Sequence, residues 1–167
     1  MEYKFKTEPY AHQLKALGAS HNKENFALFM EMGTGKSKVL VDNIAMLYDK
    51  GKINAALIIA PKGVYRNWER QEIPIHMPDH IVHNVVAWSP ATTKKQQKEN
   101  IKLFKHGEQL TIFLMNIEAF STKKGLDIAQ RFLLAHQTLM AIDESTTIKS
   151  PTARRTKNVL KLRNYAK

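Results

Sequence analysis

The sequence contains no cysteine, which excludes disulfide bonds, thiolate metal sites and catalysis by a thiol. It also has no apolar run of about 18 residues, the length that a membrane-spanning helix needs. The first residues, 1–6, do not have the basic-then-apolar order of a secretory signal. These absences predict a cytoplasmic protein that does not contact a membrane.

Acidic side chains are scarce toward the C-terminus. Residues 101–167 hold 12 basic and 5 acidic side chains, and the formal net charge of the whole chain is +11. From Ser145 to Lys167 there are seven basic residues and no acidic one. Such an excess favours a polyanion as partner, because each phosphate that is neutralised releases counterions. It is equally typical of a solvated basic helix, so charge alone leaves both interpretations open.

Short apolar segments alternate with longer amphipathic segments along the chain. Near-continuous apolar strands joined by helices predict an α/β fold, with a parallel sheet of about five or more strands between helices. We expect one domain over residues 1–167, with ligands beyond the carboxyl ends of the strands. The predicted strands are residues 26–30, 55–60, 83–88, 110–115 and 138–142. The predicted helices are residues 36–48, 64–72, 91–105 (with Ile101, Leu103 and Phe104 on the buried side), 127–135 and 151–162.

Gly33-Thr34-Gly35-Lys36-Ser37 lies between a predicted strand and a predicted helix, which is the setting of a phosphate-binding loop. Glycines let backbone N–H groups surround phosphate oxygens, and the N-terminus of the helix adds a favourable dipole. We expect Lys36 to reach the β- and γ-phosphates and the Ser37 hydroxyl to bind Mg²⁺. The full pattern has glycine where this chain has Met30, so the loop needs support from a second motif.

Asp143 and Glu144 directly follow the apolar segment 138–142 and provide that support. Asp143 would hold Mg²⁺, directly or through water, and Glu144 would polarise the attacking water. Two acidic residues at a strand end can also cap a helix or lie in a solvated turn. In combination with the phosphate-binding loop, they favour nucleotide hydrolysis.

Residues 30–37 resemble the D-E-M-G-x-G-K-[ST] loop of superfamily II helicases, especially the Swi/Snf-type translocases, where the first glycine is also replaced. Residues 9–13 (Pro-Tyr-Ala-His-Gln) are similar to the Q motif of these enzymes. Residues 143–150 resemble their motif II, DESH-x-IKN, with Thr146 in place of the usual histidine. The motifs occur in the family order over nearly the whole chain. The chain also resembles small bacteriophage helicases, which implies the cytoplasm of a bacterium or of a phage-infected host.

The resemblance implies the N-terminal RecA-like domain of an ATP-dependent DNA helicase or translocase, with ATP and Mg²⁺ as cofactors. Gln13 would read the adenine edge, because a side-chain amide pairs with a neighbouring donor and acceptor. The resemblance implies catalytic roles for Lys36, Asp143 and Glu144, and Mg²⁺ ligation by Ser37 and Asp143. The implied nucleotide-binding residues are Gln13, Met32, Gly33, Thr34, Gly35, Lys36 and Ser37.

Two more segments carry the resemblance. Residues 58–62, followed by Asn67, Trp68 and Glu72, look like motif Ia (APxx…NWxxE), whose loop touches the nucleic-acid backbone in the family. Residues 114–120 are similar to the later TNYEAL segment. Trp68 can either pack on the sheet or stack on a base, and packing is favoured because aromatic side chains chiefly bury area. The implied contacts with nucleic acid, DNA rather than RNA, are Lys62, Arg66, Asn116 and Lys149.

In the family, a motif III strand and a second RecA-like lobe with arginine fingers come next, and this chain contains neither. Arginine fingers contribute about 10³–10⁵ in rate in related phosphoryl transfer. We therefore expect the 167 residues alone to bind nucleotide and to hydrolyse it slowly or not at all.

Two other functions remain compatible with the sequence. Another P-loop phosphotransferase, such as a nucleotide kinase, would need an acceptor pocket and a basic lid, and it leaves Gln13 and Trp68 without a role. A lone module could instead bind nucleic acid or a protein without turnover.

Overall fold

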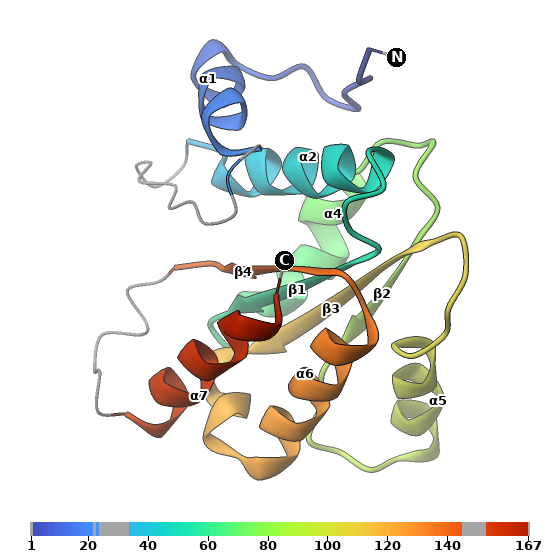
Figure 1. Cartoon of the computed structure of the whole chain (residues 1–167), viewed down its shortest axis with the longest axis vertical. Coiled ribbons are helices and arrows are strands. Elements are labelled where there is room, and N and C mark those ends of the chain that lie inside the picture. The colour runs from blue at the N-terminus through green and yellow to red at the C-terminus, as the bar shows by residue number, and fades with distance from the viewer. Residues whose placement is uncertain (1, 22, 24–33, 145–152, 167) are drawn as a thin grey trace.

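A sheet of four parallel strands forms the centre of the computed structural model, which describes residues 2–21, 23, 34–144 and 153–166 (Figure 1). The order across the sheet is β2-β3-β1-β4, and each neighbouring pair of strands is parallel. In the register, Leu57 lies opposite Phe113 on one side and opposite Met140 on the other. The strands are β1 (Ala55–Ala60), β2 (His83–Ala87), β3 (Leu110–Asn116) and β4 (Thr138–Ile142).

The apolar character of the central strands explains why they are buried on both faces. Successive side chains of a strand point to opposite faces of a sheet. In β1, Leu57 and Ile59 pack into one hydrophobic cluster, and Ile58 packs into a second cluster on the other face. Every residue of β1 and β3 is buried. The two clusters make this a three-layer α/β domain.

Helices cover both faces of the sheet, and Figure 1 shows α2 and α4 on one side and α6 and α7 on the other. Among the described helices, none has the length and apolar character to cross a membrane. The helices are α1 (Ala11–Ser20), α2 (Lys36–Asp49), α3 (Tyr65–Asn67), α4 (Ile73–His76), α5 (Lys94–Lys102), α6 (Lys123–Ala135) and α7 (Arg154–Leu162). Shorter elements are the π-helical turn η1 (Trp68–Glu72) between α3 and α4, and the 3₁₀ helices η2 (Ile117–Ser121) and η4 (Arg163–Tyr165).

The predicted parallel α/β architecture is confirmed, and the strands at 55–60, 83–88, 110–115 and 138–142 lie where the sequence placed them. The predicted strand 26–30 lies outside the described residues. One burial prediction was wrong, because Ile101 is 60% exposed while Leu103 is fully buried. The helix α5 ends at Lys102, so the chain turns before Leu103 and Ile101 stays on its outer side.

Helix α1 was not predicted as a helix from the sequence. Its buried residues are Gln13, Leu17 and Ser20, and only one of these is apolar. Prediction from hydrophobic periodicity needs an apolar stripe, which this helix does not have. Its buried face is polar because Gln13 meets the backbone of the predicted phosphate-binding loop at Thr34 and Gly35, as described below.

Candidate active site

The predicted phosphate-binding loop leads into α2, and the helix begins after Gly35. This residue has φ 76° and ψ 39°, in the left-handed region that residues with a Cβ atom adopt only at a cost. A Cβ atom at position 35 would also collide with the side-chain amide of Gln13. The backbone conformation and the close approach both require glycine here. The predicted loop residues Met32 and Gly33 lie outside the described residues.

Lys36 and Ser37 form the first turn of α2 and are half-buried. The first N–H groups of an α-helix have no carbonyl partner within the helix, and the helix dipole is positive at this end. An anionic phosphate is therefore favoured beside Lys36 and Ser37. The next lysine has a different environment: the Lys38 ammonium is buried and lies 2.7 Å from the Asp42 carboxylate.

The segment before α1 covers this buried ion pair. The Tyr3 hydroxyl donates a hydrogen bond to Asp42 Oδ1 at 3.0 Å, and the Phe5 ring centre lies 5.2 Å from Lys38 Nζ. Burial, followed by the negative charge of Asp42, raises the pKa of Tyr3 far above its usual value. Tyr3 is therefore a permanent donor that holds the N-terminal segment on α2.

Helix α1 contacts the phosphate-binding loop through Gln13 and His12. Gln13 Nε2 donates to the Thr34 carbonyl at 3.3 Å, and its Oε1 accepts from the Tyr10 N–H at 2.9 Å. His12 Nε2 lies 3.0 Å from the same Thr34 carbonyl. Both ends of the Gln13 amide are thus bonded to the protein itself. Reading of adenine by Gln13 stays a prediction, and it would require Gln13 to exchange these partners.

Asp143 follows the last residue of β4 and continues the pairing with β1, because its N–H donates to the Ile59 carbonyl at 2.7 Å. The indole Nε1 of Trp68 donates to Asp143 Oδ2 at 3.1 Å. The next residue, Glu144, is exposed and has a positive φ of 52°. Asp143 is therefore held by backbone and side-chain bonds at the carboxyl edge of the sheet.

Glu72, at the end of η1, connects the two predicted Mg²⁺ ligands. Burial and then the negative charge of Asp143 raise the pKa of Glu72, and a hydrogen bond from the Ser37 hydroxyl opposes this rise. Ser37 thus bonds to Glu72, and Asp143 bonds to Trp68 of the same turn η1. The sequence separates the two predicted ligands by more than half of the chain, and the fold brings them to one place.

The residues gathered here fit a magnesium ion. Ser37, Glu72 and Asp143 offer only oxygen atoms, which are the ligands that Mg²⁺ prefers. Within the described ranges, no group of three or more histidine and acidic residues is arranged as a complete metal cage. Mg²⁺ is usually bound through one or two protein groups together with the phosphates of a substrate.

Comparison with known proteins identifies the family. The family described as SNF2-related domain matches residues 12–167, which is most of the chain. This chain belongs to the SNF2-related domain family. The match extends from helix α1 to the last residue and includes every element of the candidate site.

A solved structure supports the same fold for this SNF2-related domain. It is similar to the "Sulfolobus solfataricus SWI2/SNF2 ATPase core in complex with dsDNA", with a TM-score of 0.65 and 20% sequence identity. The alignment covers 95% of this chain and 31% of that chain, so the SNF2-related domain spans about a third of the length of its structural relative. No curated protein matches the sequence.

The predicted nucleic-acid contacts of the SNF2-related domain have different environments. Lys62 follows β1 and is exposed; Arg66 is also exposed, and its Nε donates to the Tyr65 hydroxyl at 3.1 Å. Asn116, the last residue of β3, is only 5% exposed, and its amide donates to Glu118 at 2.9 Å. Lys149 lies outside the described residues. Lys62 and Arg66 are therefore available to a ligand as they stand, whereas Asn116 would first have to exchange a partner.

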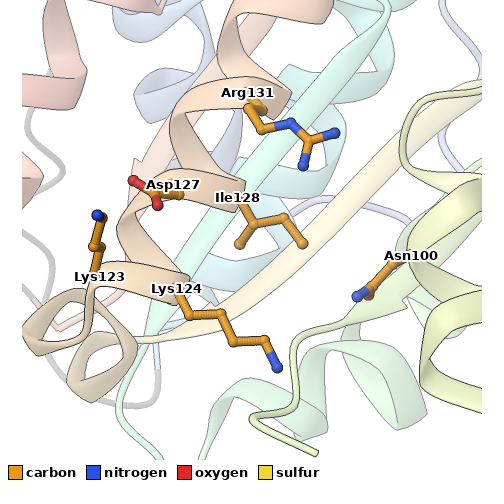
Figure 2. A pocket seen from close by; sticks show the side chains of 6 residues that line it. All are labelled: Asn100, Lys123, Lys124, Asp127, Ile128 and Arg131. Carbon is orange, nitrogen blue, oxygen red and sulfur yellow. The ribbon is translucent and has the colours of Figure 1, made fainter. Parts of the chain in front are cut away.

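An open hollow of about 530 Å³ lies between α5 and α6 of the SNF2-related domain, on the other side of the sheet from α2 (Figure 2). Figure 2 shows that its lining side chains come from α6, with Asn100 of α5 opposite. Lys124 donates to the Pro90 carbonyl at 3.1 Å, and the Arg131 guanidinium lies 5.0 Å from the Phe104 ring centre. The sheet therefore lies between this hollow and α2, which carries Lys36 and Ser37.

Sequence reasoning missed the roles of Trp68 and Glu72 in the site. It placed Trp68 in the core, which is correct, since this residue is only 1% exposed. It did not anticipate that the indole N–H reaches Asp143 or that Glu72 reaches Ser37. The available signal was their spacing of four residues in a predicted helix, which puts both side chains on one face.

Proposed function

We propose that this SNF2-related domain binds Mg-ATP at the carboxyl edge of its sheet and acts as the N-terminal motor lobe of an ATP-dependent DNA helicase or translocase. The observation that carries the proposal is that the turn η1 bonds to Asp143 through Trp68 and to Ser37 through Glu72, next to a helix N-terminus preceded by a left-handed glycine. A helix N-terminus for phosphate beside an oxygen site for Mg²⁺ is the arrangement that a nucleoside triphosphate requires.

Each residue of the proposed site has a separate role in ATP binding and hydrolysis. The first turn of α2 and the Lys36 ammonium bind the phosphates and neutralise charge on the β- and γ-phosphoryl oxygens. Ser37 and Asp143 hold Mg²⁺, which when bound stabilises negative charge on the same oxygens. Glu144 accepts a proton from the attacking water and orients it. Full activity requires a second lobe with arginine fingers, so the full-length enzyme is the ATP hydrolase and this lobe alone is weakly active or inactive.

Binding of a fluorescent ATP analogue to the full chain tests the nucleotide site. Lys36→Ala should weaken binding about 10–100-fold, because a hydrogen bond to a charged group contributes roughly 1.5–3 kcal/mol. Asp143→Asn should weaken binding in the presence of Mg²⁺ and leave binding in EDTA unchanged. The readout is fluorescence anisotropy, with circular dichroism to show that each variant is folded.

Lys52→Ala serves as the matched control, since Lys52 is an exposed lysine in the turn that leads into β1, at the opposite edge of the sheet. It should bind the analogue as the unchanged chain does. Equal affinities for Lys36→Ala and Lys52→Ala would refute the proposed site. Transfer of phosphate from ATP to a small acceptor would instead support a nucleotide kinase. DNA binding that is unaffected by nucleotide and by Lys36→Ala would support a lone binding module.

DNA is the polymer along which the proposed motor moves. The supporting observations are the exposed cations Lys62 and Arg66 at the edge that also carries the nucleotide site, and the double-stranded DNA in the structure of the similar ATPase core. Closing and opening of the two lobes during the ATP cycle would convert hydrolysis into movement along the strand. The salt dependence described in the Discussion tests this part of the proposal.

A further inference from the structure

Trp68 has its single polar group directed at the candidate metal site. The side chain is 1% exposed and packs in the core cluster with Ile58 and Leu114. A buried indole N–H requires an acceptor, and here the acceptor is Asp143 Oδ2 at 3.1 Å. A rigid, packed ring therefore fixes one oxygen of the carboxylate, Oδ2, and takes no part in binding the other.

Glu72 comes from the same helical segment and contacts the other predicted metal ligand. Its carboxylate accepts from the Ser37 hydroxyl and lies near Asp143. It also lies 3.8 Å from His76 Nε2, and about a quarter of its side chain is exposed. Unlike the indole of Trp68, this carboxylate borders on solvent, so a hydrated ion can reach it.

The π-helical turn η1 explains how Trp68 and Ile73 reach the same core next to Glu72. The Ile73 N–H bonds to the Trp68 carbonyl, five residues back, instead of the usual four. In a regular α-helix, residues five apart point about 140° away from each other. The wider turn lets Trp68 and Ile73 both reach the same core cluster, where each is 1% exposed, and it leaves Glu72 beside them at the site. Single π turns of this kind are frequent at functional sites.

We propose that Trp68 and Glu72 are positioning residues for Mg²⁺, with Trp68 orienting the Asp143 carboxylate and Glu72 orienting the Ser37 hydroxyl. This inference rests on the proposed function, because it assumes that Ser37 and Asp143 hold the ion that accompanies ATP. Groups that hydrogen-bond metal ligands raise metal affinity by fixing the direction of the ligand. Glu72 would also place a negative charge near the ion.

The test is the dependence of nucleotide binding on the metal. The affinity of the full chain for a fluorescent ATP analogue is measured in EDTA and across a Mg²⁺ titration for Trp68→Phe and Glu72→Gln. Trp68→Phe keeps an aromatic ring and removes the N–H, and Glu72→Gln keeps the shape and removes the charge. Both should bind the analogue in EDTA as the unchanged chain does, and both should need about tenfold more Mg²⁺ for the half-maximal effect. A Mn²⁺ titration followed by electron paramagnetic resonance provides a readout of metal affinity that is independent of turnover.

Matched controls show whether an effect on Mg²⁺ dependence comes from the position of the changed residue or only from its type. Glu69→Gln makes the same change three residues earlier in the same turn, and Trp88→Phe removes a second buried indole N–H, in the other core cluster. Both should keep the metal dependence of the unchanged chain. If the chain binds the analogue with its normal Mg²⁺ dependence in both Trp68→Phe and Glu72→Gln, the positioning role is wrong and the proposed function stands. If the unchanged chain binds no nucleotide, the proposed function fails, and this inference fails with it. Should Trp68→Phe not fold, Glu72→Gln decides by the same criterion.

Discussion

Gly35 and Gly51 both have a positive φ but different surroundings. Their φ values are 76° and 66°, so both lie in the left-handed region. A Cβ atom at Gly51 would meet no atom within 4 Å, whereas one at Gly35 would collide with the Gln13 amide. That amide is held at both ends and has little freedom to move away. Replacing each glycine by alanine therefore separates backbone strain from the close approach of α1 to the phosphate-binding loop.

Gly51→Ala should lower the free energy of unfolding by about 1–2 kcal/mol, the cost of a left-handed residue with a Cβ atom. Gly35→Ala should lower it by about 2–4 kcal/mol, because overpacking adds to the same strain. Urea unfolding of both variants measures the two values. Gly35→Ala should also weaken binding of the ATP analogue, and Gly51→Ala should not. Equal loss of stability in the two variants would show that Gln13 does not confine the loop.

At the scale of elements, His136 joins the end of α6 to the end of α5. Its Nε2 lies 2.6 Å from the Leu103 carbonyl, and its ring centre lies 4.9 Å from that of Phe132. Its Nδ1 is buried and has no hydrogen-bond partner among the described residues. Protonation would place an N–H without an acceptor in this position. Burial accordingly lowers the pKa of His136 below its usual value, although the bond to Leu103 opposes the change.

This histidine predicts a loss of stability in acid. Because the pKa is lower in the folded chain than in the unfolded chain, the neutral ring contributes stability above the usual value of 6.5, and this contribution is lost as the pH falls through the folded-state pKa. Urea unfolding between about pH 8 and pH 5 should show a smaller acid-induced loss for His136→Gln than for the unchanged chain. A proton titration followed by NMR that gave His136 a pKa above 6.5 would contradict this prediction.

The elements also show what a sequence can and cannot predict here. Strands β1 and β3 were predictable because their apolar residues are continuous, as strands buried on both faces require. Helix α6 begins four residues before the predicted start, at a cap formed by Thr122, whose hydroxyl accepts from the Gly125 N–H at 3.1 Å. The threonine was a usable cap signal.

The contacts between the residues of the candidate site were less predictable than the residues themselves. Lys36, Ser37 and Asp143 were recognisable from local motifs. The bond from Trp68 to Asp143 joins residues 75 positions apart, and the π turn that directs Trp68 and Ile73 to one core depends on packing against the sheet. The hydrophobic periodicity of the local sequence predicts neither the bond nor the π turn. The buried face of α1 has the same limitation, because its glutamine is specified by a backbone carbonyl of another segment.

At the scale of the whole molecule, the parallel sheet places two kinds of group along one edge. Ala60, at the end of β1, pairs with Asn116, at the end of β3, and the Asp143 N–H bonds to Ile59 of β1. Lys62 follows β1 by two residues. The proposed DNA contact and the proposed Mg²⁺ site are therefore attached to neighbouring strands of a rigid sheet.

Salt dependence of DNA binding tests the proposed track. Lys62→Ala and Arg66→Ala should each lower the slope of log affinity against log salt concentration by about 0.9 on duplex DNA, because each removes one phosphate contact. The measurement is fluorescence anisotropy of labelled DNA at several salt concentrations. Lys102→Ala is the matched control, since Lys102 ends α5 near the opposite edge of the sheet and lies 2.9 Å from Glu99. An equal change in slope for Lys102→Ala would indicate attraction to net charge without a defined path for the strand.

The ion pair inside α2 links the N-terminal segment to the candidate active site. Lys38 and Asp42 lie within the first two turns after Lys36, and Tyr3 and Phe5 shield them from water. Proteolytic cleavage before α1 would expose the buried charges of Lys38 and Asp42 to water, close to the proposed nucleotide site. We therefore expect digestion or a bulky fusion at the N-terminus to weaken binding at the proposed nucleotide site.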